Sequence, residues 1–229
     1  MKLQKRNCEI EMKLVPYGAG WTDVYFNIGN DKLYFIITSI FGDQFSKLLE
    51  VLYYLHPAQN DPKRNDDVDY WEGVCKSEEG RYKVTKIVER CEECPATIVY
   101  IPHKAELRWD EEGSYSHWIF TREPTEDTDF VLRIDICIHR NEEKHYSYQI
   151  QYKDFCYAVA KTCTEVLKSH GIYGYHHSTY EDDINLRHLL FVKAVALDCL
   201  ETRKLTDNGD GLGNSTSFKE EMELLLFDM

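Results

Sequence analysis

The segment FVLRIDICIH, residues 130–139, carries the clearest structural pattern in this sequence and decides the class of its fold. Apolar residues occupy every second position, and most of the residues between them are polar. Successive side chains of a strand point to opposite faces, so this two-residue period predicts a strand with one buried face. RNEEK, residues 140–144, is a turn pattern, and YSYQIQ, residues 146–151, is expected to be the returning strand. The segment therefore predicts an antiparallel hairpin.

Three stretches on either side of this hairpin have the period of helices. In FGDQFSKLLEVLYYL, apolar residues recur three and four positions apart, which predicts a helix near 43–55 with Asp43 as its N-cap. A second helix is predicted at 154–170 and is expected to end at Gly171, because glycine suits the left-handed position after a helix. The third helix is predicted at 184–204. Each has an apolar face that is suited to covering a sheet.

Further strand patterns complete the predicted architecture, and they lie at 8–16, 24–28, 33–40, 82–89, 96–101 and 104–109. We therefore predict a single α+β domain over residues 1–205. Its largely antiparallel, twisted sheet of six or more strands would have the helices packed on one face. A hairpin followed by a helix occurs near 23–55 and again near 129–167. The two units are either ββα pseudo-repeats or two instances of a common arrangement.

Three segments are predicted to lie outside this sheet. Residues 57–80 are polar and contain two prolines, which predicts a polar excursion. Residues 206–217 have the composition of a flexible linker. Residues 218–229 predict a short amphipathic helix with Ser217 and Glu220 as its capping box. This helix either docks on the domain or binds a partner.

The composition is that of a globular protein with an excess of negative charge. Among 229 residues, 40 are acidic and 27 are Lys or Arg, which gives a formal net charge of −13. This charge is expected to repel nucleic acid and anionic membranes and to favour a basic protein as partner, although acidity also serves solubility. No apolar run approaches the ~18 residues of a membrane span, and the N-terminus lacks a signal-peptide pattern. We expect a cytoplasmic protein with reduced cysteines, no membrane association and no cofactor.

The motif CEEC supplies the first candidate metal ligands, Cys91 and Cys94. A structural zinc site needs about four Cys or His ligands, and Cys75 and His103 could complete such a set. The two glutamates between the thiols are expected to raise the thiol pKa values and so to oppose metal binding. Redox chemistry of the thioredoxin type needs a thiol at a helix N-terminus, whereas Pro95 and the residues after it predict a strand. The alternative is that both thiols are small side chains near the start of a strand.

A second candidate metal site is formed by His177 and Glu181, within GYHHSTYEDD at residues 174–183. Four residues apart on a helix, these side chains would meet across one turn, which suits a weak divalent site or acid–base chemistry. The alternative is an exposed loop whose acidic residues face the positive end of the dipole of the next helix.

Cys137 and His139 are two residues apart on the strand at 130–139, and they therefore share one face of it. A Cys–His nucleophile pair would need this proximity. The alternative is that two solvent-facing side chains coincide by chance.

Aromatic residues suggest a candidate binding surface. Tyrosine and tryptophan anchor interfaces because they bury a large area and keep a polar group. The alternative is that these residues pack in the core and in the half-buried face of a sheet. The predicted surface comprises Tyr115, Trp118, Tyr146, Tyr148, Tyr173 and Tyr175.

Several of these segments together resemble an uncharacterised bacterial family. The pattern of that family is an acidic EEPGEYRW-like hairpin with a long helix that ends in a Gly-Tyr segment. The similar segments here are GAGW (18–21), FGDQFSKLLEVLYYL (41–55), ELRWDEEGSYSHWIF (106–120), FVLRIDICIH, DFCYAVAKTCTEVL (154–167) and HGIYGY (170–175). The resemblance implies a cytoplasmic α+β fold and brings no established activity. The segment from about 57 to 100, which contains CEEC, is longer here than the family pattern.

Two functions follow as hypotheses. The first is a non-enzymatic binding module, such as an immunity-like inhibitor of a basic bacterial protein, whose acidic, tyrosine-rich surface attracts and anchors its partner. The second is a metal-binding protein or a metal-assisted hydrolase that uses the Cys and His candidates. The sequence contains no Gly-x-Ser-x-Gly elbow, Walker loop, dinucleotide fingerprint or His-Glu-x-x-His motif. The first hypothesis is therefore preferred.

Overall fold

The computed structural model describes most of the chain outside its long polar segments. It describes the backbone alone for residues 18, 44, 177 and 178, for the strands between 74 and 101, and for the pairs at 206–207 and 214–215. The described residues are 9–18, 20–38, 44–57, 74–79, 82–91, 94–101, 104–111, 113–123, 129–178, 183–200, 206–207, 214–215 and 217–229.

The N-terminal strands form an antiparallel sheet of three strands in the order β1-β2-β3. Along these strands the buried residues alternate with exposed ones, as a two-residue period predicts. The turn between the second and third strands begins at Gly29, whose φ of 57° is easily adopted by glycine. The strands are β1 (Glu11–Gly18), β2 (Trp21–Ile28) and β3 (Asp31–Thr38).

Seven further strands form a second sheet in the order β10-β9-β8-β7-β6-β5-β4, and all neighbours in it are antiparallel. The hairpin predicted over residues 130–151 is confirmed, because His139 pairs with Glu143 and Val131 pairs with Gln151. The strands are β4 (Val74–Glu79), β5 (Tyr82–Cys91), β6 (Cys94–Ile101), β7 (Lys104–Asp110), β8 (Tyr115–Arg122), β9 (Val131–His139) and β10 (Glu143–Gln151).

The presence of two sheets corrects the prediction of one. The α+β class and the antiparallel pairing are confirmed. The N-terminal strands, however, pack on the inner face of the large sheet, where the rings of Phe26 and Phe35 lie 5.6 and 5.2 Å from that of Trp118. Alternation indicates that a strand has a buried face but not which strands it pairs with. The two hairpin–helix units therefore start from different sheets, and their relation as pseudo-repeats stays a prediction.

The four helices of the described chain are α1 (Gln44–Leu55), α2 (Tyr152–Ser178), α3 (Leu186–Ala196) and α4 (Phe218–Leu226). Helix α2 extends past its predicted end, and Gly171 interrupts it with φ 69° and ψ 168°. Helix α3 begins close to its predicted start, where the Asn185 side chain accepts a hydrogen bond of 3.1 Å from the amide of His188. It ends at Ala196 and not at residue 204. None of these helices is both long and apolar enough to span a membrane.

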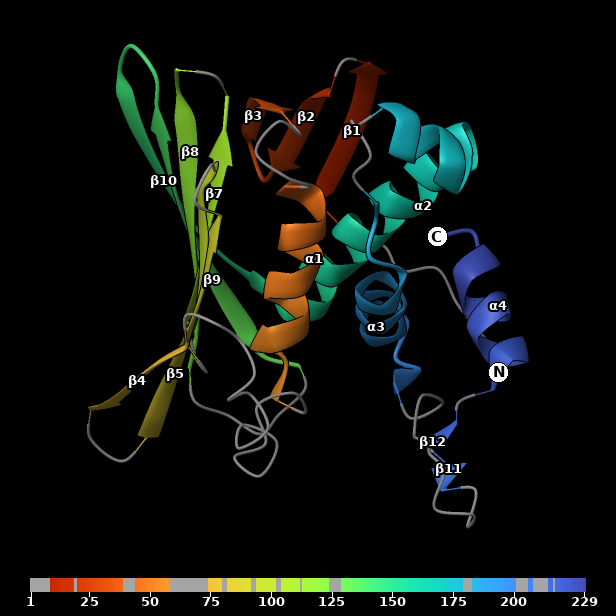
Figure 1. Ribbon diagram of the computed structural model, residues 1–229. Coiled ribbons are helices and arrows are strands. Elements are labelled where there is room, and N and C mark those ends of the chain that lie inside the picture. The colour runs from red at the N-terminus through yellow and green to blue at the C-terminus, as the bar shows by residue number, and fades with distance from the viewer. Residues whose placement is uncertain are drawn as a thin grey trace.

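The helices lie on one side of the large sheet, as predicted (Figure 1). Helix α1 packs against β6 and β7, and helix α2 crosses behind it to reach β1 and α3. The buried hydroxyl of Thr162 on α2 donates to the carbonyl oxygen of Met12 on β1, which fixes the helix to the N-terminal sheet. None of the helices in the described part of the chain covers the outer face of the large sheet (Figure 1).

The C-terminal helix α4 docks on the body of the protein. Its N-cap is confirmed, because the Ser217 hydroxyl accepts a hydrogen bond from the amide of Glu220. Leu224 and Met229 are buried, and the ammonium group of Lys193 on α3 donates to the carbonyl oxygens of residues 225 and 227. Within the predicted linker, β11 (Thr206–Asp207) pairs with β12 (Asn214–Ser215). The rest of that linker, and most of the excursion predicted near 57–80, lie outside the described residues.

Candidate metal centre

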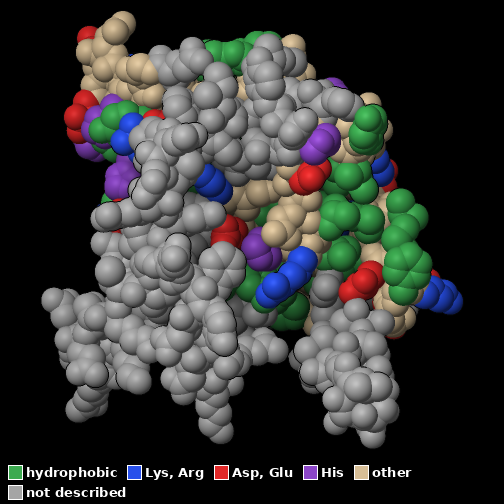
Figure 2. Space-filling model, viewed as in Figure 1, with side chains coloured by type: hydrophobic (Ala, Val, Ile, Leu, Met, Phe, Trp, Pro, Cys, Tyr) green, Lys and Arg blue, Asp and Glu red, His purple; other side chains and the backbone are tan. Residues whose placement is uncertain are grey.

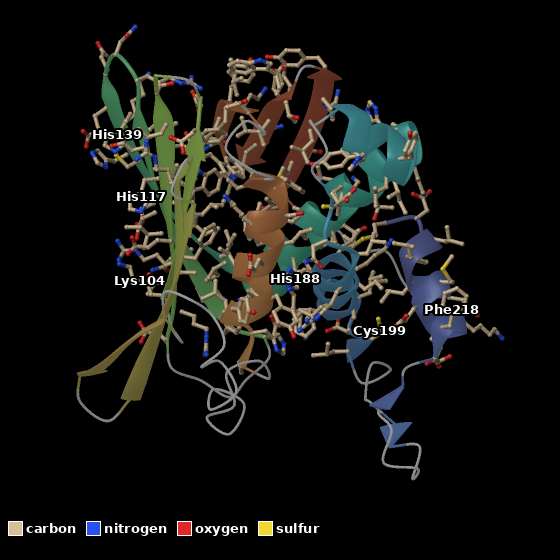
Figure 3. The ribbon with its side chains drawn as sticks, viewed as in Figure 1. Lys104, His117, His139, His188, Cys199 and Phe218 are labelled. Carbon is tan, nitrogen blue, oxygen red and sulfur yellow. The ribbon has the colours of Figure 1, made fainter. Side chains whose placement is uncertain are left out.

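The outer face of strands β7 to β10 carries polar side chains that lie side by side across the sheet. The strand register places Arg108 opposite His117, His117 opposite Cys137, and Cys137 opposite His145. Figure 3 shows His117 and His139 on the side of the sheet away from helix α1. Figure 2 shows histidine and acidic side chains together at the upper left, over the same part of the molecule.

Four of these side chains converge at the β9–β10 turn and form the Cys137 cluster, which consists of Cys137, His139, Glu143 and His145. The first three each offer a donor atom, and these atoms lie within 4.8 Å of one another. The Cys137 sulfur is 3.0 Å from Nε2 of His139, 3.5 Å from the nearer Glu143 carboxylate oxygen and 3.9 Å from Nε2 of His145. His145 Nε2 is also 2.8 Å from that carboxylate. One sulfur, one imidazole and one carboxylate therefore lie close together, and the imidazole of His145 lies beside the sulfur and the carboxylate.

The separations of the Cys137 sulfur from His139 and Glu143 are close to those between the ligands of a tetrahedral zinc ion. With zinc–sulfur bonds of about 2.3 Å and zinc–nitrogen bonds of about 2.0–2.1 Å, neighbouring donors of a tetrahedron are roughly 3.3–3.6 Å apart. The Cys137 sulfur lies 3.0 Å from the His139 nitrogen and 3.5 Å from the Glu143 oxygen.

The hairpin itself explains why these residues meet. Residues two apart on a strand share a face, which puts Cys137 beside His139 and Glu143 beside His145. The turn at residues 140–142 then returns the chain so that Glu143 lies opposite His139 and His145 lies opposite Cys137. The ligand pattern is therefore Cys-x-His-x3-Glu-x-His, and a hairpin register is required to recognise it.

Two aromatic and cationic contacts hold His139 in place. The ring of Tyr115 stacks on the imidazole with 4.3 Å between centroids and 23° between planes. The guanidinium group of Arg108 covers the Tyr115 ring at 4.0 Å and also binds Asp110, which is buried. This stack restricts the rotation of the imidazole and keeps its Nε2 directed at Cys137.

The electrostatics of the cluster keep the Cys137 thiol protonated when no ion is bound. Burial raises its pKa, and the hydrogen bond to Glu143 and the negative charge of that carboxylate raise it further. The same hydrogen bond from the thiol lowers the pKa of Glu143, helped by His139 and His145. A Cys–His nucleophile pair needs a lowered thiol pKa, so these directions do not support that interpretation of Cys137 and His139.

The predicted aromatic surface is divided among several parts of the molecule. Tyr115 lies on the outer face of the large sheet, whereas Tyr146 and Tyr148 are half-buried on its inner face and Tyr173 is exposed on helix α2. Trp118 and Tyr175 are buried in the core with exposed fractions of 0% and 5%, which corrects their assignment to a surface. Trp118 lies two residues before Phe120 on β8, so both side chains point to the same buried face of the sheet. This spacing is the sequence signal that Trp118 points inward.

The predicted metal ligands lie largely outside the described side chains. Cys91 ends β5 and pairs with Cys94 at the start of β6, so only their backbone positions are described. His177 lies in the last turn of α2, also as backbone, and His103 and Glu181 lie outside the described residues. The structure brings together Cys137 and His139, which share a face as expected. Glu143 and His145, which complete the cluster, are absent from the residues chosen by sequence reasoning.

Comparisons with known proteins give no information on function, so the geometry of this site is the main evidence. Comparison of the chain with protein families, with curated proteins and with solved structures finds no match. The family resemblance stated from sequence segments therefore stays a prediction.

Proposed function

We propose that this protein binds a divalent transition-metal ion, of which zinc is the best fit, at the Cys137 cluster. The observation that carries the proposal is the convergence of three donors at the β9–β10 turn, with the Cys137 sulfur 3.0 Å from His139 and 3.5 Å from Glu143 and with His145 beside both the sulfur and the carboxylate. Cys137 and His139 would be ligands together with Glu143 and His145. The metal-binding hypothesis is thus retained with a different set of residues.

The donor chemistry favours zinc over magnesium and calcium. Thiolate and imidazole ligands suit zinc, whereas magnesium and calcium bind almost entirely through oxygen. The thiol must lose its proton when the ion binds, so affinity should increase with pH and binding should release a proton. Arg108 and Tyr115, which hold His139, would act as the outer shell that orients a metal ligand.

Zinc binding to untagged protein is the decisive experiment. We expect one zinc ion per chain after removal of excess metal, because the mutually close donors form a single site. Cys137→Ser and His139→Gln should each lose this binding, and cobalt-loaded wild type should show a sulfur-to-cobalt charge-transfer band that Cys137→Ser lacks. His117→Gln is the matched control, since His117 faces the same side of the sheet with a similar exposure.

Two results would contradict the proposal. One is a wild-type protein without bound zinc, and the other is full zinc binding by Cys137→Ser. The second result would direct attention to Cys91 and Cys94, whose backbones are paired at the end of the β5–β6 hairpin.

The earlier hypothesis, an immunity-like inhibitor of a basic protein, stays a prediction. It rests on the net charge of −13. The aromatic residues chosen for it do not share one face, so we assign no described surface to such a partner.

A further inference from the structure

A groove of about 510 Å³ lies between the N-terminal sheet and helix α2, in a different part of the chain from the Cys137 cluster. Its accessible apolar lining comes from the exposed rings of Tyr25 on β2 and Tyr34 on β3, which share the outer face of this sheet with Lys13. Cavities of about 300–1,000 Å³ with an apolar lining and a few polar groups are typical of small-molecule sites. The groove therefore has the size and the lining of a ligand site.

Three lysines line this groove, and the described part of the chain offers none of them a partner. Lys13, Lys32 and Lys161 border it, and no hydrogen bond or ion pair joins any of them to another residue in the described ranges. Elsewhere the lysines of the described chain are mostly paired, as Lys153 is with Asp198 at 2.6 Å and Lys168 with Asp228 at 2.8 Å. Unpaired cations gathered at one groove are unusual in a chain with a net charge of −13.

The acidic residues of the groove do not neutralise these lysines. Glu11 accepts a hydrogen bond of 3.4 Å from the amide group of Asn27, and Glu165 lies one helical turn beyond Lys161 without an ion pair to it. Three cations therefore face two carboxylates, and the groove keeps an excess of positive charge. Such a local field attracts anions even to an acidic protein.

We infer that this groove binds a small amphipathic organic anion. A carboxylate or phosphate headgroup would lie among Lys13, Lys32 and Lys161, and a short alkyl chain would lie on the rings of Tyr25 and Tyr34. Lysine suits either headgroup because it acts as a flexible point charge. This inference is independent of the proposed metal site.

Calorimetric titration with three amphiphiles of equal alkyl length tests both parts of the ligand. The probes are decanoate, decyl phosphate and decyltrimethylammonium, each below its micellar concentration. We expect one of the anions or both to bind and the cation not to bind, with weakening as salt is added. Inorganic phosphate alone should bind more weakly than decyl phosphate, because it lacks the alkyl chain that covers the apolar lining.

Charge-removing variants locate the site. Lys32→Gln and Lys161→Gln should each weaken anion binding by about two- to fivefold, as expected for the loss of one partly exposed ion pair. The matched control is Lys144→Gln, which removes an exposed lysine from β10 on the large sheet. It should bind the anions as tightly as the wild type.

Several outcomes would overturn the inference. They are an absence of binding by both anions, equal binding of the cationic probe, and equal weakening by Lys144→Gln. Circular dichroism of each variant shows whether the fold is retained. Should Lys32→Gln fail to fold, Lys161→Gln alone decides the result, because that side chain lies on the helix side of the groove.

Discussion

At the scale of single residues, Lys193 is an unusual core residue. Its side chain is fully buried on helix α3, where the ammonium group donates to Thr164 Oγ1 at 3.1 Å and to the carbonyl oxygens of Leu225 and Phe227 at 3.0 and 2.7 Å. Burial lowers its pKa from 10.5 to about 8, and the positive charge of Lys168 contributes. Cys163 and Asp228 oppose this shift. Lys193 is therefore a polar connection between the body of the protein and the C-terminal helix.

This lowered pKa predicts a gain in stability at alkaline pH. Between pH 8 and 10.5 the unfolded chain holds a proton on Lys193 that the folded chain has released, so the free energy of unfolding rises with pH. We expect a gain on the order of 1 kcal/mol from pH 7 to pH 9. Urea denaturation at both pH values measures it. Lys193→Met should lack this gain, and a parallel rise in the variant would contradict the assignment to Lys193.

For single residues, the two-residue period of a strand is sufficient to predict which side chains share a face. The shared face of Cys137 and His139 followed from their spacing on one strand. Glu143 was missed because its approach depends on the register across the turn, which single-strand periodicity does not specify. For Trp118, residue type alone favours a surface position, whereas its spacing of two residues from Phe120 on β8 indicates an inward side chain.

At the scale of elements, helix α2 contains a break that sequence reasoning interpreted as its end. Gly171 has the expected positive φ, but ψ is 168° and a further helical segment follows. A glycine after a helix indicates that the chain leaves the helical path, whereas the direction in which it resumes depends on tertiary packing. The sequence therefore predicts the presence of a helix more reliably than the residue at which that helix ends.

Two glycine substitutions in helix α2 should have opposite effects. Gly171 has a backbone conformation that is essentially restricted to glycine, so Gly171→Ala should lower the free energy of unfolding by about 1–3 kcal/mol. Nothing lies within 4 Å of the added Cβ, so the cost is conformational. Gly174→Ala, whose Cβ would make an ordinary contact of 3.7 Å with His170, should raise it by about 0.5–1 kcal/mol. Thermal denaturation compares them, and equal effects would contradict this account.

At the scale of the whole molecule, the two sheets are held together by polar contacts as well as by aromatic packing. Arg140, in the β9–β10 turn, lies 2.8 Å from the buried carboxylate of Glu111 and donates to the carbonyl oxygen of Tyr34 on β3 at 3.1 Å. The hydroxyl of Tyr148 donates to Asp31 at the start of the same strand at 2.9 Å. The turn that carries the Cys137 cluster is thereby fixed to the N-terminal sheet.

Removing the Arg140 side chain should destabilise the fold more than removing an exposed arginine. Arg140→Met leaves Glu111 buried without its cation, and we expect a loss of about 2 kcal/mol, less than for a fully buried pair because Arg140 is partly exposed. Arg133→Met, which removes a more exposed pair with Asp135, should cost at most about 1 kcal/mol.

Urea denaturation of a double-mutant cycle measures the coupling between Arg140 and Glu111. The double variant Glu111→Gln with Arg140→Met should be more stable than Arg140→Met alone, because it removes the uncompensated charge. An additive cycle would contradict a direct interaction.

The sequence predicted the class of this molecule, its main hairpin and its helices, but not the division of its strands between two sheets. Each strand carries its own alternation, while its choice of neighbours depends on contacts such as Phe35 with Trp109 and Trp118 that join distant segments. The groove between β1 and α2 could not be predicted for the same reason, since Lys13 and Lys161 meet only in the folded chain.

The donors of the Cys137 cluster all come from the short segment between residues 137 and 145. Closing so short a loop costs little chain entropy, so, if the cluster binds zinc as proposed, an unfolded chain would keep part of that affinity. A ligand that also binds the unfolded state adds less to stability than one that binds the folded state alone. Uptake of the metal would then not have to wait for folding, and a ribosome-bound nascent chain could acquire its ion once this segment has emerged.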